Sequence, residues 1–242
     1  MPAYVEYPIA FCVFGLLFTA AERRWPARRI DYRTVLKDDI GALFVYGLVF
    51  LPISVHVTNQ LLPSNVIVVG ALLDLPLPVR VVLYYVVGDL GLYAMHRLMH
   101  SPYAWRIHRW HHSPRHLYWL AGIRATVPNQ VLFTLPFALV SPLLHHAPTW
   151  LLLLEFAEAF FHNNWMHTNI TWRSRWLELV FVTPRYHHVH HSSAPEHHCA
   201  NLGSYFTVWD RLFGTYVDPE TAGDLAFGLV DAPSPLRVAV GI

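Results

Sequence analysis

The chain has 242 residues, of which 54% are hydrophobic and only 14% are charged, and its formal net charge is +1. Soluble proteins contain about 25% charged residues, so this composition, with a mean hydropathy of +0.32, predicts a membrane protein. The near-neutral charge gives no electrostatic basis for binding nucleic acid. The two cysteines, Cys12 and Cys199, do not suggest a disulfide framework.

Five apolar segments are spaced along the chain, and a helix needs about 20 mostly apolar residues to cross a membrane. They are Tyr4–Ala21, Ile40–Leu62, Val79–Met95, Val127–Leu144 and Trp150–Phe161. The last segment is short for a full crossing, so we interpret the last two as a hairpin around the polar turn HHAPT. The first segment lacks the basic start and the cleavage site of a secretory signal peptide, so we expect it to be retained.

Basic residues predict the orientation of these segments. Six of them lie between the first two segments: Arg23, Arg24, Arg28, Arg29, Arg33 and Lys37. Because loops rich in lysine and arginine stay in the cytoplasm, this loop is predicted to be cytoplasmic, and the histidine-rich stretches then fall on the same side. The predicted fold is all-α, a multi-pass membrane helical bundle of about four spans or hairpin segments with a cytoplasmic helical cap that carries the histidines.

The 17 histidines are concentrated in four short boxes, HRLMH, HRWHH, HNNWMH and HHVHH. Residues three or four apart lie on one face of a helix, so each box can present its imidazoles to a shared metal ion. The ten histidines at ligand spacing are His96, His100, His108, His111, His112, His162, His167, His187, His190 and His191. Ten ligands are too many for one tetrahedral zinc ion, so the boxes predict two metal ions with about five nitrogens each.

A histidine-rich tract that merely buffers metal is the alternative, but it predicts irregular spacing in a polar loop, whereas these boxes border apolar segments. Seven other histidines are expected to be hydrogen-bonded or interfacial residues: His56, His116, His145, His146, His188, His197 and His198. Of these, His197 and His198 lie close to the fourth box.

Asp89 is an ionisable residue within the third apolar segment, and such residues usually mark functional sites. It shares one helical stripe with Tyr93, His96 and His100. Two interpretations follow. Asp89 accepts a hydrogen bond from a ligand imidazole and fixes its tautomer, or it forms an interhelical bond or ion pair, for example with Arg106 or Arg124.

Five motifs, DLGLYAMHRLMH, WRIHRWHHSP, FFHNNWMH, TPRYHHVHHS and NLGSYFTVWDRLFGTY, occur in this order between Val79 and Val217. In this the chain resembles the fatty acid hydroxylase/sterol desaturase superfamily, whose members are membrane-embedded non-haem di-iron enzymes. The resemblance implies metal ligands at all ten histidines except His167, where the chain departs from sterol-desaturase-like members. The H-x4-H spacing of that box instead resembles carotenoid ring hydroxylases.

The resemblance implies an oxidoreductase of lipid biosynthesis that holds two Fe ions and uses O₂ as co-substrate. The expected reaction is hydroxylation of a lipid-like substrate: a fatty acyl chain, a sterol or triterpenoid, a carotenoid or a sphingolipid. Desaturation is the alternative, followed by a zinc-dependent hydrolase or a metal-binding protein, because imidazole suits zinc as well as iron.

A separate electron donor of the ferredoxin, cytochrome b5 or reductase type is expected, since the sequence has no dinucleotide fingerprint. The arginine-rich, lysine-poor usage indicates a bacterial plasma membrane. We expect one structural domain with N-terminal membrane segments (1–78), a catalytic region (79–217) and a C-terminal tail (218–242).

Overall fold

The described part of the chain is helical. The computed structural model describes residues 3–62, 70–231 and 234–241, so residues 1–2, 63–69, 232–233 and 242 of the predicted regions lie outside it. Within the described residues, extended segments pair only in three isolated bridges, such as the one between Phe181 and Phe206. The predicted all-α class is therefore confirmed.

Five long helical segments build the bundle. They are α1 (Ala3–Arg24), α2 (Tyr32–Val45) continued by η1 (Tyr46–Phe50) and α3 (Leu51–Leu61), α5 (Leu77–Met99), α7 (Val127–Val140) continued by η3 (Ser141–Leu144), and α8 (Thr149–His167). Among the described residues, three of these are long and apolar enough to cross a membrane: Tyr32–Leu61 with 30 residues, Leu77–Met99 with 23 and Val127–Leu144 with 18. The first of the three begins at Tyr32 rather than at the predicted Ile40, and the predicted Trp150–Phe161 lies within the longer helix α8.

The span Tyr32–Leu61 is one continuous helix with a wide turn in its middle. At η1 the N–H of Leu51 donates to the Tyr46 carbonyl, five residues back, as in a π-helix. Pro52 follows directly and has no N–H to donate, which explains why the regular hydrogen-bond ladder shifts here. The side chains of Phe44 and Leu48 are 61% and 74% exposed, so this helix presents an apolar face to its surroundings, as a lipid-facing span must.

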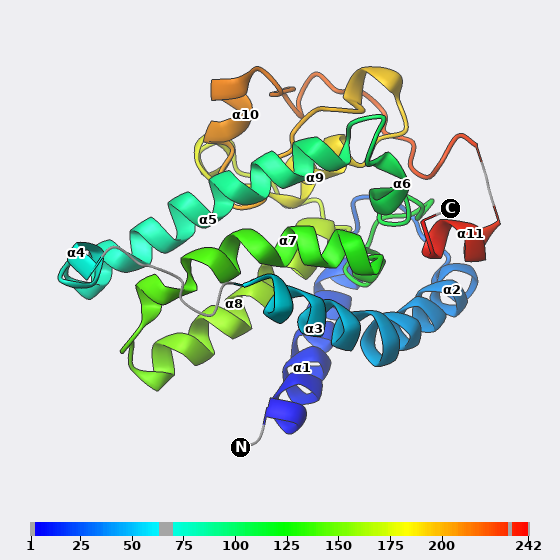
Figure 1. Ribbon diagram of the computed structural model, residues 1–242. Helices are drawn as coiled ribbons and strands as arrows, with labels where there is room; N and C mark the ends of the chain where they lie inside the picture. Colours follow the sequence, from blue (N-terminus) through cyan, green and yellow to red (C-terminus); the bar gives the residue numbers. More distant parts are fainter. Residues whose placement is uncertain (1–2, 63–69, 232–233, 242) are drawn as a thin grey trace.

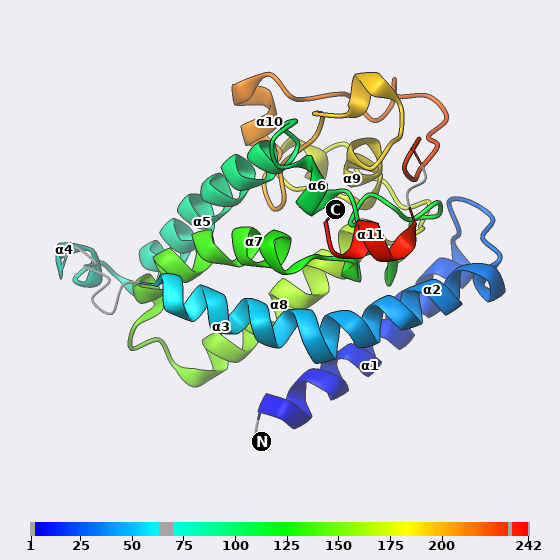
Figure 2. The same cartoon turned by 45° about the vertical axis from the view of Figure 1, so that its right-hand side comes forward.

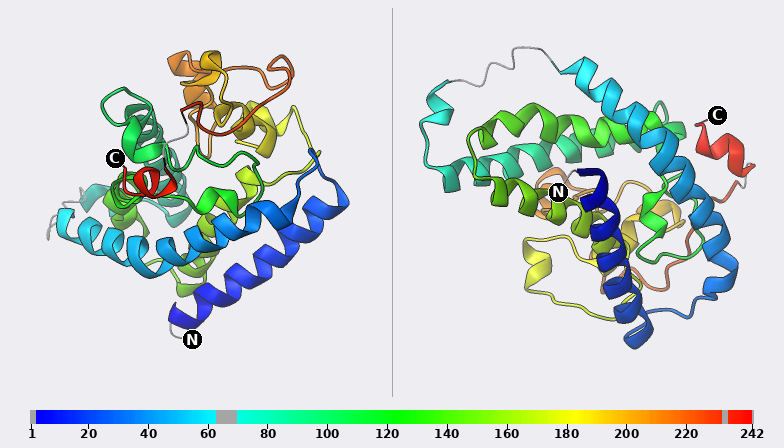
Figure 3. Two further views of the ribbon diagram at one scale, coloured as in Figure 1. Left: turned by 90° about the vertical axis from the view of Figure 1, so that its right-hand side faces the viewer. Right: turned by 90° about the horizontal axis from the view of Figure 1, so that it is seen from below.

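Helices α5 and α7 lie side by side, as Figure 3 shows on its right. Two glycines of α5 permit the close approach. A Cβ at Gly88 would lie 2.6 Å from the Phe137 ring, and one at Gly91 would lie 2.9 Å from Cβ of Pro136. Small residues let helix backbones approach closely in a membrane, and here they fix α5, whose last turn carries the first histidine box.

The short helices form a cap at one end of the bundle. Figures 1 and 2 show α6 (Trp105–His108), α9 (Pro184–His190) and α10 (Val208–Phe213) gathered at the end away from the N-terminus. The remaining short helices are α4 (Gly70–Leu73), η2 (Ala121–Ile123), η4 (Leu177–Leu179), η5 (Pro195–His197) and α11 (Pro235–Ala239). The cap meets the C-terminal ends of α5 and α8, and all four histidine boxes therefore lie at this end.

Buried carboxylates tie the first two helices to the cap. Glu22 at the end of α1 accepts hydrogen bonds from the backbone N–H groups of Trp119 (2.8 Å) and Asn169 (2.9 Å). Asp39 of α2 is fully buried and forms an ion pair with Arg124 at 2.5 Å. Because a buried charge needs a partner, this pair anchors α2 to the segment that follows the second histidine box.

Candidate metal centre

Local structure explains how each box displays its imidazoles. His96 lies in the last turn of α5, and His100 caps the same helix, so both project from one end of a membrane span. Thr183 caps α9 by accepting a hydrogen bond from the Tyr186 N–H, and Pro184 begins the helix, where its missing N–H costs least. The short helix α9 therefore starts at a defined residue and presents its histidines in fixed directions.

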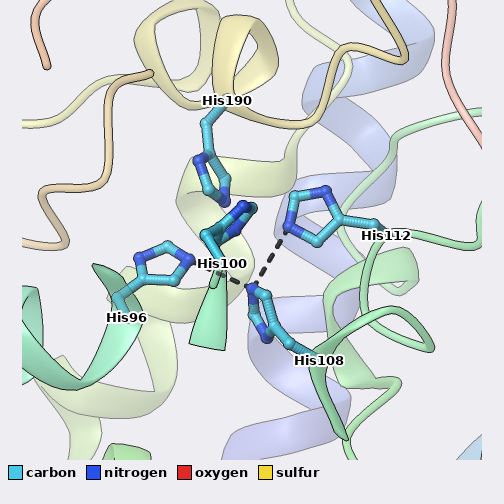
Figure 4. A group of neighbouring side chains, drawn as sticks. All are labelled: His96, His100, His108, His112 and His190. Atoms are coloured by element: carbon cyan, nitrogen blue, oxygen red, sulfur yellow. Dashed lines mark hydrogen bonds between the residues drawn. The ribbon is translucent and has the colours of Figure 1, made fainter. Parts of the chain in front are cut away.

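The first histidine group brings together five buried imidazoles from α5, the α6 turn and α9. Its members are His96, His100, His108, His112 and His190, whose ligand nitrogens lie within 4.8 Å of one another. Figure 4 shows their rings converging on one point. Nε2 of His108 lies 3.1 Å from Nε2 of His96 and 3.2 Å from Nε2 of His112.

The second histidine group has four buried members, His111, His167, His187 and His191. His167, the last residue of α8, lies at its centre. Its Nε2 is 3.1 Å from Nε2 of His191, 3.2 Å from that of His187 and 3.3 Å from that of His111. A Cβ at Gly122 would lie 2.5 Å from Nδ1 of His167, so only glycine leaves room for this ring.

Hydrogen bonds at the far side of several rings fix their orientation. Nδ1 of His96 donates to the Leu202 carbonyl (2.7 Å), and Nδ1 of His190 donates to the Ala200 carbonyl (2.9 Å). Nδ1 of His108 donates to Oδ1 of Asn129 (2.5 Å). A ring that donates from Nδ1 keeps the Nε2 lone pair free, which is the tautomer that binds a metal ion.

Burial keeps these imidazoles neutral. At the end of α6 and in the turn after it, burial, reinforced by the neighbouring histidines, lowers the pKa of His108, His111 and His112 well below the usual range. Metal ligation needs the neutral ring, because a protonated imidazole has no lone pair to give. The cap therefore stabilises the binding form at neutral pH.

Two buried carboxylates hold the loop that orients the rings. Asp89 accepts hydrogen bonds from the backbone N–H groups of Tyr205 (3.0 Å) and Phe206 (2.9 Å) and from Nε1 of Trp209 (2.9 Å). Asp210 accepts from the N–H groups of Leu202 and Gly203, both at 2.7 Å. The bond from Trp209 joins α5 to α10, as the interhelical interpretation of Asp89 expects, while Arg124 pairs with Asp39. Asp89 thus acts on the histidines through the loop.

The structure brings nine of the ten predicted ligands into the two groups and leaves His162 outside them. Nε2 of His162 donates to the Ser204 carbonyl at 2.6 Å, and its ring stacks on Tyr205 with centroids 4.1 Å apart. About one and a half turns of α8 therefore separate a histidine that contacts the orienting loop from one that lies in the second group.

A third group was not foreseen from the sequence. His100, His198 and the thiol of Cys199 also lie within 4.8 Å of one another, with His198 and Cys199 exposed. The only signal was the nearness of HHC to the fourth box. Of the other histidines, His188 accepts a hydrogen bond from Nη1 of Arg28 at 2.9 Å, and none of His56, His116, His145 and His146 joins a group within the residues that the structure describes.

Comparisons with known proteins place the chain in a family. The fatty acid hydroxylase family matches residues 81–215, which is more than half of the chain. The ornithine lipid hydroxylase OlsE of Rhizobium tropici is 32% identical over 64% of this chain and 46% of its own length. Human alkylglycerol monooxygenase is 28% identical over 53% of this chain and 28% of its own. The Delta(7)-sterol 5(6)-desaturase ERG3B of Gibberella zeae is 29% identical over 59% of this chain and 43% of its own length.

The chain spans less than half the length of each of these three relatives. No solved structure matches it. The family match includes every histidine of the two buried groups and overlaps two of the three candidate membrane spans found among the described residues. The chain belongs to the fatty acid hydroxylase family.

Proposed function

We propose that the protein is a di-iron, O₂-dependent hydroxylase of a lipid-like substrate. The observation that carries this proposal is the convergence of nine buried neutral histidines into two adjoining groups. One iron ion is assigned to each group, with His96, His100, His108, His112 and His190 as ligands of the first and His111, His167, His187 and His191 as ligands of the second. His162 is not part of this ligand set.

The residues fit such ions. Both ring nitrogens of His100 and Nε2 of His190 are buried without a hydrogen-bond partner, and unpaired buried polar atoms are costly unless something binds them. Nε2 of His108 lies 3.1–3.2 Å from Nε2 of His96 and His112, and Nε2 of His167 lies 3.1–3.3 Å from that of each other member of its group. Two imidazoles that bind one ion at about 2.1 Å each are separated by about 3.0–3.4 Å, so the spacing is that of ligands to a shared ion.

When bound, the two irons supply the reduction of O₂ that lets an unactivated C–H bond be oxidised. The protein's own residues position and insulate this centre. The loop 200–206 fixes the rings of His96 and His190 through its carbonyls, and Asn129 fixes His108. The ligand histidines are themselves buried, which limits the contact of a reactive centre with water.

Hydroxylation is preferred to desaturation because the ornithine lipid and alkylglycerol relatives are named for oxygen insertion. Desaturation is the second candidate, because the ERG3B relative is named a desaturase. A zinc-dependent hydrolase is less favoured, since the sequence has no H-E-x-x-H pattern to provide a general base.

The proposal includes a cytoplasmic location for the histidine cap and a bacterial plasma membrane. Three observations support it: the basic loop between α1 and α2, the gathering of the histidines at one end of the bundle, and the arginine-rich composition. It also includes a separate electron donor of the ferredoxin, cytochrome b5 or reductase type, the kind of partner that the family resemblance implies.

Metal analysis of the detergent-purified protein tests the proposal. We expect about two iron ions per chain, magnetically coupled in Mössbauer spectra, and a loss of that coupling in His111→Ala and His190→Ala, while the exposed His116→Ala keeps it. Incubation of the reduced protein with O₂ and ornithine lipids, alkylglycerols or sterols should yield a product that gains one oxygen atom. A product that only loses two hydrogens would make the protein a desaturase, and zinc that iron does not displace would refute both.

A further inference from the structure

A pocket of about 420 Å³ opens beside the first histidine group. Three histidines of that group line it, namely His100, His112 and His190, together with Trp105 and the exposed His198. The pocket therefore connects the surface of the cap to the side of the group that Figure 4 shows around His100.

His198 lines this pocket, and Cys199 follows it directly in the chain. Pro195 begins the short helix η5, His198 follows its last residue, and the thiol of Cys199 donates a weak hydrogen bond to the His100 carbonyl at 3.9 Å. The imidazole of His198, the thiol of Cys199 and the imidazole of His100 lie within 4.8 Å of one another. A thiolate and two imidazoles are donors that divalent transition-metal ions prefer.

His100 is the member shared by this outer group and the first histidine group. It is 2% exposed, yet neither of its ring nitrogens has a hydrogen-bond partner. His96, His108 and His190 differ, because an oxygen atom holds Nδ1 of each ring. Metal-bound histidines usually have such a partner, whereas no hydrogen bond holds the ring of His100 in one orientation.

We propose that His198 and Cys199 form, with His100, an outer binding site for a divalent transition-metal ion, from which the ion enters the five-histidine group. The inference rests on the proposed metal centre. The two exposed donors capture the hydrated ion, and the thiol releases its proton to solvent as it binds. His100 already binds the ion at this stage. Rotation of its side chain then carries the ion inward along the pocket to the four other imidazoles of the first group.

A simpler role for His198 is an aromatic contact, since its ring centroid lies 4.7 Å from that of Trp105. That role gives no function to Cys199 and no reason for His100 to lack a partner. It also predicts that removing the thiol has no effect on metal uptake, which separates the two explanations.

Cobalt uptake by the metal-stripped, detergent-solubilised protein tests the proposal, because a thiolate bound to Co²⁺ absorbs in the near ultraviolet and imidazole ligands do not. Rapid mixing with Co²⁺ should give a thiolate band that appears first and decays as the ion moves to the histidines. We expect the band in the unaltered protein and in Cys12→Ser and His116→Ala, two exposed control positions. Cys199→Ser should abolish it.

The final cobalt content should be unchanged in Cys199→Ser and His198→Ala, while the rate of uptake falls by about tenfold or more. An absent band in the unaltered protein, or a rate equal to that of the controls, would overturn the proposal. A final content well below two ions in every variant would instead refute the proposed centre, and the thiolate band would still report on the outer site.

Discussion

The two histidine groups use the same sequence pattern in opposite ways. The second and fourth boxes both read H-x-x-H-H, and in each the first and last histidines join one group while the middle one joins the other. His108 and His112 belong to the first group and His111 to the second. His187 and His191 belong to the second group and His190 to the first.

Helix geometry explains the exchange. On α9, residues four apart lie nearly above each other, whereas adjacent residues point about 100° apart, so the fourth box serves two neighbouring ions. In the second box the chain continues beyond α6 as a turn, in which the His111 N–H donates to the His108 carbonyl. Each group thus receives a pair from one box and a single histidine from the other. Removal of the histidines of either box would therefore weaken the binding of both ions.

The groups differ in what holds them. The first is oriented by the loop 200–206 and by Asn129, and three of its members line the pocket, against one member, His191, of the second group. The second depends on His167, whose Nδ1 donates to the Asn163 carbonyl of its own helix at 2.7 Å. The first group is therefore sensitive to distant residues, and the second to the end of α8.

The largest effect is expected from His167→Ala, since this ring contacts all three other members of the second group. We expect the variant to lose about one iron ion per chain and nearly all activity, because a metal ion binds weakly when a central ligand is missing. The matched control is His162→Ala, on the same helix. Iron analysis and Mössbauer spectra of both variants provide the comparison.

His162→Ala should keep both ions, because His162 contacts the loop at Ser204 and not a ligand nitrogen. The reverse outcome, with iron lost from His162→Ala and kept in His167→Ala, would contradict the ligand set proposed for the second group.

A smaller effect is expected from Asp89→Asn. An amide in place of the carboxylate turns an NH₂ group toward backbone N–H donors, so the contacts to Tyr205 and Phe206 are weakened. The loop then holds His96 and His190 less firmly, and the affinity for the first ion should fall by about 10- to 100-fold. Competition with a chelator measures it.

Asp74→Asn serves as the control for Asp89→Asn, because Asp74 is exposed. A purely structural role for Asp89 would lower thermal stability and leave both metal affinities equal to those of the control. A selective loss of affinity for the ion of the first group would show that Asp89 acts as a positioning residue.

The sequence indicated the histidines of both groups but not their division. Box spacing requires only that His108, His111 and His112 share a region of a helix, and which ring meets which partner depends on how α6 and α9 pack against each other. His162 and His167 look equivalent in the box, yet α8 ends at His167, so that residue alone reaches the cap centre. Asp89 was noticed because it is charged within an apolar helix, but its partners follow 116–120 residues later and no local pattern reveals them.

The smallest effect concerns His188, which lies between the ligands of α9 without joining either group. Burial, together with the nearby Arg28 guanidinium, lowers its pKa to about 3. In the unfolded chain a histidine titrates near 6.5, so between about pH 3 and pH 6.5 the unfolded state binds a proton that the folded state does not. Folding stability at this site is complete above about pH 6.5 and falls as the pH is lowered.

His188→Gln removes this titration and keeps an oxygen that accepts a hydrogen bond from Arg28. We expect the unfolding temperature of the variant to fall less than that of the unaltered protein between about pH 7.5 and pH 5, although the buried ligand histidines still contribute in both proteins. Thermal unfolding of the two proteins in the same detergent measures the difference. If the unfolding temperatures of the two proteins fall by the same amount, His188 is not held neutral in the folded protein. The cap would then tolerate a charged His188 beside the second group.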